Sequence, residues 1–483
     1  MDTRRIEELR AQMCPLEAPA ALRRAWLQQV AEHGETFLER LPGRKVYEPP
    51  QEDPRGILRS PFAEEGAPLA DLLALVGRYV EDAGINLGSA GHLGFIPPSS
   101  LYPAALGDYL ATVINRYVGV YFTAPGAVQM ENMVLRWMAD FVGFPAAAGG
   151  DLTSGGSLAN LIGVVTAREA HDLRARDYER VVVYLTAQTH HSVAKALRIA
   201  GMKECIQRQI PLDAGFHMQP EALSAAIDED RRNGRIPWLI VGSAGTTDTG
   251  AVDPLEELGE IAHRARLWLH VDGAYGAMFA LCEPGRAALR GMELANSLVL
   301  DPHKGLFMPC GSGAVLVRDG EALLRAYAYD AHYLQDEGTL AKDEISPSAH
   351  SPELTRPLRA LRIWLSLKLL GVQPFRAALE EKMLLARYFH ARIQELPGFE
   401  VGPKPDLSIV TFRYRPQRGD ADEFNRRLTA AVQHDGRVFL SSTVIGGAHT
   451  LRVAVLSATT HKERIDTALE VLQEKAQAIE KGE

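Results

Sequence analysis

Five short apolar runs limit what this chain can fold into more than any other feature of its sequence. The runs are VVVYL at 181–185, WLIVG at 238–242, LWLHV at 267–271, SLVLD at 297–301 and AVLV at 314–317. Stretches long enough to form amphipathic helices separate them. Apolar runs of four or five residues between helices are typical of strands that are buried on both faces. The pattern therefore predicts an α/β domain built on a mostly parallel sheet.

The chain as a whole divides into three predicted parts. Residues 1–85 show helical periodicity around a Pro- and Gly-rich break, and we expect a helical arm that packs on a second subunit. Residues 86–372 contain the apolar runs and form the predicted large domain, whereas residues 373–483 form a predicted small α+β domain. With 483 residues the chain is longer than a single core supports, so more than one domain is expected. The helices predicted for the arm are residues 6–13, 22–41 and 69–80.

Composition excludes several classes of partner. The chain has 52 basic and 61 acidic residues and a net charge of −9, which argues against nucleic acid as a partner. No apolar run approaches the roughly 18 residues of a membrane span, so no membrane partner is expected. The opening residues MDTRRIEELRAQM lack the apolar segment of a signal peptide, and the four cysteines lack the spacing of zinc ligands. These features predict a cytoplasmic protein with reduced thiols and no metal site.

Polar residues follow three of the predicted strands and a short segment at 151–153, and the ends of strands are where ligands of open α/β sheets collect. The segment TSGGS at 153–157 precedes a predicted helix, and its glycines would let backbone N–H groups approach an anion. His190 follows the run at 181–185, and Asp272 follows the run at 267–271. Lys304 lies in DPHKG, just after the run at 297–301. A partly buried lysine is costly to keep charged and so becomes a usable amine nucleophile.

Each of these features also has a purely structural explanation. The TSGGS segment and Asp272 could cap helices, His190 could be a structural histidine, and Lys304 could lie on the surface. Together, however, the four features match the polar groups of pyridoxal 5′-phosphate (PLP). This cofactor needs a phosphate cradle, a slot for its ring, a carboxylate for its ring nitrogen and a lysine for its aldehyde. Its chemistry requires no metal.

The ordered set TSGGSLAN, THHS, GTTDTG, HVDGAYG and DPHKG resembles the group II PLP-dependent decarboxylases, especially the aromatic-L-amino-acid decarboxylase type. The resemblance extends from GHLGFIPPSSLYPAALGDYLA at 91–111 to LRVAVLSATT at 451–460, and the two motifs that hold Asp272 and Lys304 are highly specific. It implies the fold of PLP-dependent transferases of fold type I, the aspartate aminotransferase type. It also implies a homodimer with its site at the subunit interface. The implied reaction converts an L-amino acid, expected to be aromatic, into an amine and CO2.

The resemblance assigns roles around the cofactor ring to four residues. Lys304 would hold PLP as a Schiff base, and Asp272 would pair with the ring nitrogen. Ala274 would pack on one face of the ring and His190 on the other. Lys304, His190 and Asp272 are therefore the expected catalytic residues.

Other matched positions would hold the phosphate and the substrate. The phosphate would bind Gly156, Ser157 and His303. Thr247 in GTTDTG is similar to a family threonine that hydrogen-bonds in the cofactor and substrate region. The N-terminal side of the expected substrate pocket consists of Phe95, Ile96 and Pro97.

The chain departs from the family at a mobile loop, for which residues 334–357 are the predicted counterpart. The family carries a tyrosine there, near our Pro347, that is thought to protonate the substrate carbon. This chain has no tyrosine between Tyr333 and Trp364. Replacement of that tyrosine in the family is associated with oxygen-consuming, carbonyl-forming chemistry. An aldehyde synthase or another Cα-bond lyase is therefore the alternative function.

His350 is the residue of this loop that could supply the missing acid, or it could be a solvated loop residue.

Two smaller departures from the family lie close to Lys304 in the sequence. Gly305 replaces a tryptophan of many relatives, from which we expect a larger or looser pocket. The side chain of Asp301 would repel a phosphate, so we expect it to point away or the residue to contribute only its backbone. A third hypothesis is a member of the family without catalytic activity that serves as a structural or binding subunit.

Overall fold

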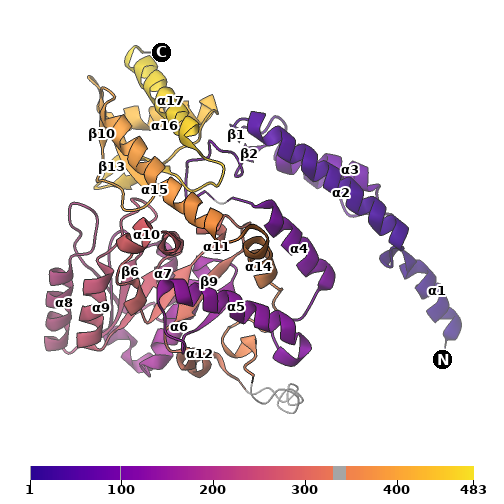
Figure 1. The fold of residues 1–483 in the computed structure, drawn as a ribbon, viewed down its shortest axis with the longest axis horizontal. Helices are drawn as coiled ribbons and strands as arrows, with labels where there is room; N and C mark the ends of the chain where they lie inside the picture. Colours follow the sequence, from indigo (N-terminus) through magenta and orange to yellow (C-terminus); the bar gives the residue numbers. More distant parts are fainter. Residues whose placement is uncertain (1, 98, 330–343, 483) are drawn as a thin grey trace. The chain divides into compact units, whose positions relative to one another are not determined.

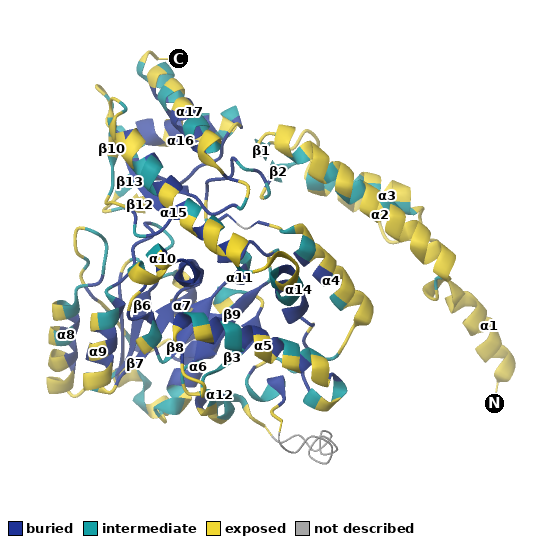
Figure 2. Ribbon diagram, viewed as in Figure 1, coloured by how far each residue is buried: buried dark blue, intermediate teal, exposed yellow. Residues whose placement is uncertain are grey.

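The computed structural model describes residues 2–97, 99–329 and 344–482, and the chain divides into two compact units, Met1–Ser89 and Ala90–Glu483 (Figure 1). In the first unit the helices are α1 (Thr3–Met13), α2 (Ala20–Arg40) and α3 (Leu69–Val76), the last continued by a π-turn at Gly77–Glu81. Strand β1 (Tyr47–Glu48) pairs with β2 (Gly84–Ile85). The three helices predicted for the arm are therefore present. None of the described residues of α1, α2 and α3 is buried (Figure 2).

A seven-stranded mixed sheet forms the centre of the second unit (Figure 1). Its strand order is β3-β9-β8-β7-β6-β4-β5, and within the described sheet β9 alone runs against its neighbours. The predicted mostly parallel sheet is thus confirmed, and each of the five apolar runs contributes a strand. The strands are β3 (Gly149–Thr153), β4 (Val181–Leu185), β5 (Ile206–Gln209), β6 (Ile236–Ser243), β7 (Trp268–Asp272), β8 (Ser297–Leu300) and β9 (Gly313–Val317).

Helices cover both faces of this sheet. In β4, Val181 and Val183 pack into one apolar cluster together with residues of α6 (Gly156–Ala170) and α7 (His191–Ile199). Val182 and Tyr184 pack into the cluster that contains residues of α5 (Pro125–Val142), α8 (Pro220–Arg232) and α9 (Leu255–Ala265). Successive residues of a strand point to opposite faces, so a strand covered on both sides must be apolar throughout. This packing explains why the central strands read as continuous apolar runs.

The helices of this region precede the sheet, lie between its successive strands or follow its last strand, β9. They are α4 (Tyr102–Ile114), α5 (Pro125–Val142), α6 (Gly156–Ala170), α7 (His191–Ile199), α8 (Pro220–Arg232), α9 (Leu255–Ala265), α10 (Glu283–Ala288), α11 (Pro302–Gly305), α12 (Gly320–Tyr327) and α14 (Ala360–Leu370). Because β4, β6, β7 and β8 are parallel, their carboxyl ends meet at one edge of the sheet. The loops after these strands are where a ligand site is expected.

A second sheet of four antiparallel strands lies near the C-terminus, in the order β10-β11-β13-β12. Its strands are β10 (Phe399–Val401), β11 (Ile409–Tyr414), β12 (Ser441–Ile445) and β13 (Ala448–Ala454), and its helices are α15 (Gln373–Gln394), α16 (Ala421–Asp435) and α17 (Lys462–Glu480). The mixture of helices and short strands confirms the predicted α+β character. The boundaries predicted between the three parts of the chain stay predictions. Across the described ranges, no helix is both long enough and apolar enough to cross a bilayer.

Candidate active site

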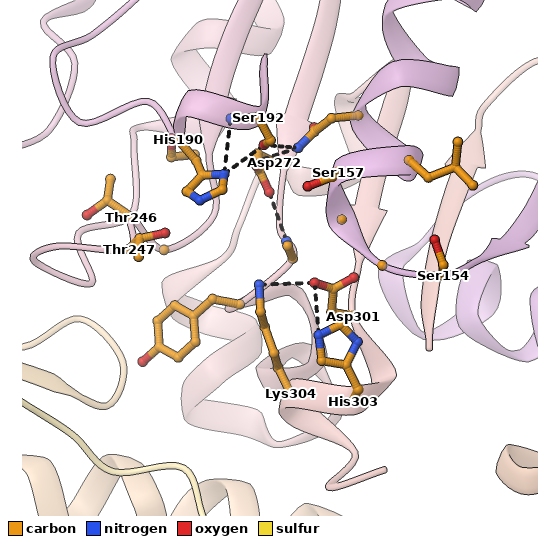
Figure 3. Close-up of a pocket in the computed structure, with 18 of the residues that line it drawn as sticks. Ser154, Ser157, His190, Ser192, Thr246, Thr247, Asp272, Asp301, His303 and Lys304 are labelled. Atoms are coloured by element: carbon orange, nitrogen blue, oxygen red, sulfur yellow. Dashed lines mark hydrogen bonds and ion pairs between the residues drawn. The ribbon is translucent and has the colours of Figure 1, made fainter. Parts of the chain in front are cut away.

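A cavity of about 290 Å³ opens at the carboxyl edge of the large sheet, in the second unit (Figure 3). Loops after β3, β4, β6, β7 and β8 supply its walls, so residues distant in sequence meet there. The wall contains Ser154, Gly155, Gly156, Ser157, Leu158, Asn160, Gln188, His190, Ser192, Ser243, Gly245, Thr246, Thr247, Asp272, Ala274, Tyr275, Asp301, His303 and Lys304. The sheet topology therefore gathers the polar residues that the sequence places after separate strands.

The N-terminus of α6 forms one side of the cavity. Gly155 has a φ of +151°, a conformation that side chains disfavour, and it directly precedes the helix. A Cβ on Gly156 would lie 3.1 Å from Oδ2 of Asp301 and 3.2 Å from Cβ of Ala274, so the backbone there is closely surrounded. The first N–H groups of a helix have no partner within the helix and carry partial positive charge. This side of the cavity can hold an anion such as a phosphate.

Asp272 ends β7 and is nine-tenths buried. Its Oδ1 accepts a hydrogen bond from the backbone N–H of Ala274 at 3.1 Å, and its Oδ2 accepts one from Nδ2 of Asn160 at 3.0 Å. A buried carboxylate is costly unless it is hydrogen-bonded, and both oxygens are satisfied here. The geometry presents a fixed anion at the cavity wall.

His190 immediately precedes α7 and its Nδ1 lies 2.7 Å from Oγ of Ser192. The backbone N–H of Ser192 also donates to Nδ1, at 3.3 Å. Burial lowers the pKa of His190, and the neighbouring Asp272 carboxylate offsets this only in part. The ring is therefore neutral near pH 7, which suits packing against a flat ligand.

Lys304 lies on α11, directly after β8, and its side chain reaches toward the carboxylate of Asp301 (Figure 3). Nζ of Lys304 is 3.0 Å from Oδ2 of Asp301, and Nε2 of His303 is 3.6 Å from the same oxygen. Our expectation that Asp301 points away from the site was therefore wrong. A buried carboxylate is costly to leave unpaired, and the amine of Lys304 pairs with it.

Gly305 does not widen the cavity either, contrary to our expectation. A Cβ at this position would lie 2.3 Å from Cβ of Met278, so Met278 already fills the space that a larger residue would need. Gly305 is buried and does not contribute to the cavity wall. Its role is to let α11 pack closely against the segment that holds Met278.

The structure brings together all eight residues predicted to bind the cofactor. These are Gly156, Ser157, His190, Thr247, Asp272, Ala274, His303 and Lys304, and each lines the cavity. Eight further wall residues with polar side chains were not predicted to bind the cofactor: Ser154, Asn160, Gln188, Ser192, Ser243, Thr246, Tyr275 and Asp301. All of them except Gln188 and Ser243 belong to motifs quoted above, and for Ser192 and Thr246 the proximity to His190 and Thr247 was the available signal.

The four residues predicted for the substrate pocket do not line this cavity in the described chain. Residues 95–97, which we call the Phe95 segment, run beside the C-terminal sheet. There the backbone N–H of Phe95 donates to Oγ of Ser441 at 2.9 Å, and the ring centroid of Phe95 lies 5.9 Å from that of Phe439. Ile96 and Pro97 follow in the same segment. His350 ends a short 3₁₀ helix and lines a different cavity that contains Glu131, and burial lowers its pKa. Their assignment to a substrate pocket stays a prediction, and Tyr333 lies outside the described residues.

The geometry of the cavity wall fits PLP. Two buried acceptors on the wall, Oε1 of Gln188 and Oδ1 of Asp301, have no hydrogen-bond partner among the described residues. Buried polar atoms left without a partner are costly, so they indicate a polar ligand. A cradle for an anion, a fixed carboxylate and a lysine amine match the phosphate, ring nitrogen and aldehyde of the cofactor. The described residues contain no cluster of three or more His, Cys, Asp or Glu side chains suited to a metal ion.

Comparison with known proteins identifies the family. Residues 89–415 match the model of the pyridoxal-dependent decarboxylase conserved domain. The chain belongs to the pyridoxal-dependent decarboxylases. It is 35% identical to an aromatic-L-amino-acid decarboxylase of Bacillus atrophaeus over 415 residues, which cover 85% of this chain and 86% of the relative. It is also 29% identical to a phenylacetaldehyde synthase of Petunia hybrida, covering 80% of this chain and 81% of that protein.

Among solved structures, the crystal structure of Oryza sativa TDC with PLP and tryptamine superposes with a TM-score of 0.89. The two sequences are 26% identical, and the match covers 95% of this chain and 99% of the other. The fold predicted from the motifs, that of PLP-dependent transferases of fold type I, is confirmed. This decarboxylase is thus a PLP-dependent carboxy-lyase, and PLP is its cofactor.

Proposed function

We propose that this decarboxylase converts an aromatic L-amino acid into the corresponding amine and CO2, with Lys304 as the residue that binds PLP. The observation that carries the proposal is the meeting of Lys304, Asp272 and the N-terminus of α6 in one cavity. The identity of 35% to an aromatic-L-amino-acid decarboxylase supports the choice of substrate class.

Bound PLP supplies an electron sink that accepts the electron pair released when a bond at the substrate Cα breaks. Lys304 would hold the cofactor through its amine and release it to the substrate amine. Asp272 would pair with the ring nitrogen and keep it protonated, because a fixed anion favours the positively charged form. Ala274 and His190 would enclose the ring, and His303 with Gly156 and Ser157 would bind the phosphate.

We infer an uncharged substrate side chain from the residues that line the cavity. An acidic substrate needs a cation for its distal carboxylate, and arginine is the residue best suited to that task. Among the described residues that line the cavity there is no arginine. We place Phe95, Ile96 and Pro97 at the substrate side chain, as the resemblance implies, where an aromatic residue would add apolar contact.

A second function, that of an aldehyde synthase, is favoured by one specific observation. The chain has no tyrosine from residue 334 to residue 363, where the family places its proton donor. Decarboxylation to an amine takes up a proton at Cα, so loss of the donor leaves the carbanion open to oxygen. The competing reaction consumes O2 and water and gives an aldehyde, CO2, ammonia and hydrogen peroxide. His350 is the candidate donor that would keep the reaction on the amine route.

We also propose that the enzyme is a homodimer that acts in the cytoplasm. The helices of the first unit carry many exposed large apolar residues, and such a surface is costly to leave in water. They include Ile6, Leu9, Met13, Trp26, Leu27, Val30 and Leu72. A second copy of the chain would cover them. All four cysteines are free thiols, which agrees with a reducing compartment.

A product assay over a panel of amino acids tests the proposed function. The purified enzyme with PLP is incubated with each L-amino acid, and CO2, amine, ammonia and peroxide are measured together. We expect equal amounts of CO2 and amine from aromatic substrates and no activity in the Lys304→Ala variant. Ammonia and peroxide in place of amine would establish the aldehyde synthase instead. Activity confined to acidic substrates would refute the proposed substrate class.

A further inference from the structure

Asn160 lies in the cavity wall, where it contacts Asp272 directly and is linked to His190 through Ser192. It is 1% exposed and projects from α6. Its Nδ2 donates to Oδ2 of Asp272 at 3.0 Å and to Oγ of Ser192 at 2.9 Å. Oγ of Ser192 in turn lies 2.7 Å from Nδ1 of His190. One buried amide thus connects the carboxylate and the histidine of the site.

A second set of hydrogen bonds holds Asn160 from the interior. Nε2 of His270 lies 2.7 Å from Oδ1 of Asn160, and Nδ1 of His270 lies 2.7 Å from Oγ of Ser297. Nε1 of Trp268 donates to the same Ser297 oxygen at 2.8 Å. His270 and Ser297 are completely buried, so no solvent competes for these bonds. Trp268, Ser297, His270 and Asn160, which we call the inner chain, form one continuous path.

The two ends of this path determine the direction of every hydrogen bond in it. The indole of Trp268 can only donate, and the ionised carboxylate of Asp272 can only accept. The amide of Asn160 must therefore turn its NH2 toward Asp272 and its oxygen toward His270. Nε2 of His270 must then carry the proton, and its Nδ1 accepts from the hydroxyl of Ser297.

Two further features support a neutral His270 in this arrangement. Burial lowers the pKa of His270 to about 4, so the ring has one proton to place at neutral pH. Gly163, one turn after Asn160 on α6, leaves room for the ring, since a Cβ there would lie 2.5 Å from Cε1 of His270. Helix α6 thus presents the amide and the space for the ring on the same face.

The direction of the bonds continues to His190. Oγ of Ser192 accepts from Asn160, so its own hydrogen is available for Nδ1 of His190. The backbone N–H of Ser192 points at the same nitrogen. A nitrogen that faces two donors has no place for a proton, so the neutral ring carries its proton on Nε2.

We propose that Asn160, held by the inner chain, is a positioning residue that keeps Asp272 in its hydrogen-bond-accepting form and His190 as the neutral Nε2–H tautomer. The inference rests on the proposed function, which places these two side chains at the cofactor ring. A neutral histidine can pack on a protonated ring without repulsion, whereas an imidazolium would oppose the positive charge that Asp272 stabilises. The amide thus couples two requirements of the same cofactor.

The test is histidine ¹⁵N NMR of the full-length enzyme prepared without PLP, which reports the protonated nitrogen of each ring directly. His190→Gln and His270→Gln spectra assign the signals. In the wild type we expect Nε2–H with unprotonated Nδ1 for both rings near pH 7.5. A cationic His190, or one protonated on Nδ1, would overturn the proposal.

Asn160→Asp is the decisive variant, because it keeps the shape and the acceptor for His270 but removes the donor to Asp272 and Ser192. The new carboxylate accepts from the Ser192 hydroxyl, which then no longer donates to His190. We expect the protonation midpoint of His190 to rise by about one pH unit or more. Titrating the same variant with PLP should show about tenfold weaker binding, since the two facing carboxylates share a proton. The other charged groups near His190, namely His191, Asp248 and Lys304, are unchanged.

Asn296→Asp is the matched control, since Asn296 precedes Ser297 but its Oδ1 only accepts from the N–H of Leu269. It adds the same charge nearby and should leave both histidine signals as in the wild type. If Asn160→Asp does not fold, Ser192→Ala gives a second measurement. In that variant the ¹⁵N signals of His190 should no longer indicate a single tautomer. Wild-type signals in both variants would refute the role of Asn160. A wild type that does not bind PLP would instead refute the proposed function, because the NMR result does not require the cofactor.

Discussion

Gly163 on α6 stands directly against the imidazole of His270, and a Cβ at position 163 would fall 2.5 Å from Cε1 and 2.7 Å from Nδ1 of that ring. Real Cβ atoms do not approach other atoms so closely, so Gly163→Ala must displace the histidine. We expect the variant to lose about 1–3 kcal/mol in the free energy of unfolding, measured by urea denaturation. Its affinity for PLP should also fall, because the ring supports Asn160.

Gly126→Ala is the control for this substitution. Gly126 lies in the first turn of α5, and no atom lies within 4 Å of a Cβ built there. Alanine should leave stability unchanged or raise it by up to about 1 kcal/mol, because it favours the helix over the unfolded chain. Equal stability of the two variants would contradict the close contact at His270.

The stability of the enzyme without PLP should depend on pH through His270. Its pKa is about 4 in the folded chain, against roughly 6.5 when unfolded. The unfolded state therefore binds more protons between these values, and stability present above pH 6.5 is lost as the pH falls toward 4. The loss is on the order of 3 kcal/mol for this one ring.

Comparing wild type with His270→Gln across pH 4–7 isolates this contribution from that of other groups. The difference between their free energies of unfolding should shrink steadily as the pH falls from 6.5. His263→Gln, which replaces an exposed histidine on α9, should parallel the wild type throughout. A difference independent of pH for His270→Gln would show that the ring is not held neutral.

Gly313 at the start of β9 keeps the segment before α6 in place. A Cβ there would lie 2.5 Å from Cα of Gly155 and 2.6 Å from Oγ1 of Thr153. Gly313→Ala should therefore displace the backbone that would bind the phosphate, and affinity for PLP should fall about tenfold, the loss of roughly one charge-assisted hydrogen bond. Binding of pyridoxal, which has no phosphate, should change much less. A similar loss for both ligands, measured by absorbance titration, would argue against a phosphate site here.

Arg452 on β13 hydrogen-bonds to the backbone of Thr247 and, through Ser441, is connected to the Phe95 segment. The loop that holds Thr247 is called the Thr247 segment below. It is 3% exposed, and its guanidinium donates to the backbone oxygen of Thr247 at 2.6 Å and to Oγ of Ser441 at 2.9 Å. The same serine oxygen accepts from the N–H of Phe95. Arg452→Met should raise KM for the amino acid about tenfold, with a smaller change in kcat, because both segments would lose a shared anchor.

Arg413→Met provides the comparison for Arg452, since Arg413 lies on the neighbouring strand β11 and pairs with Asp422 of α16. The substitution removes an arginine from the same sheet, but Arg413 contacts neither the Thr247 segment nor the Phe95 segment. The loss of such an ion pair has a small effect, so KM should stay within about twofold of wild type. Steady-state kinetics on one aromatic substrate is sufficient. If both variants raise KM equally, Arg452 has no special connection to the substrate.

The strands of the large sheet were predictable wherever both of their faces are buried. The runs at 181–185 and 314–317 fall within β4 and β9 because every residue there packs against a helix layer. Strand β5 escaped prediction since it lies at the sheet edge, and in IQRQ only alternate residues are partly buried. Strand β12, SSTVI, is partly exposed for most of its length and was missed for the same reason.

The cavity residues were predictable where a motif follows a strand, as for Lys304 and Asp272. Asn160 ends the quoted motif TSGGSLAN, but its role was not predictable, because that role depends on a hydrogen bond to a carboxylate 112 residues away. His270 was visible in LWLHV but gave no sign that it faces a helix amide. Asp301 was placed wrongly because the expectation considered only the phosphate and not the lysine 3.0 Å away.

Identifying the lysine that carries PLP tests the central claim most directly. The enzyme loaded with PLP is reduced with borohydride, digested and mapped by mass spectrometry. Lys382 is the internal comparison, since it is completely buried and burial lowers its pKa. It lies on α15 and donates to Glu381 and to the backbone oxygen of Thr460. We predict pyridoxyl mass on the peptide that contains Lys304 and none on the peptide that contains Lys382. Label on another lysine, or no label on a protein that absorbs as a PLP enzyme, would contradict the account.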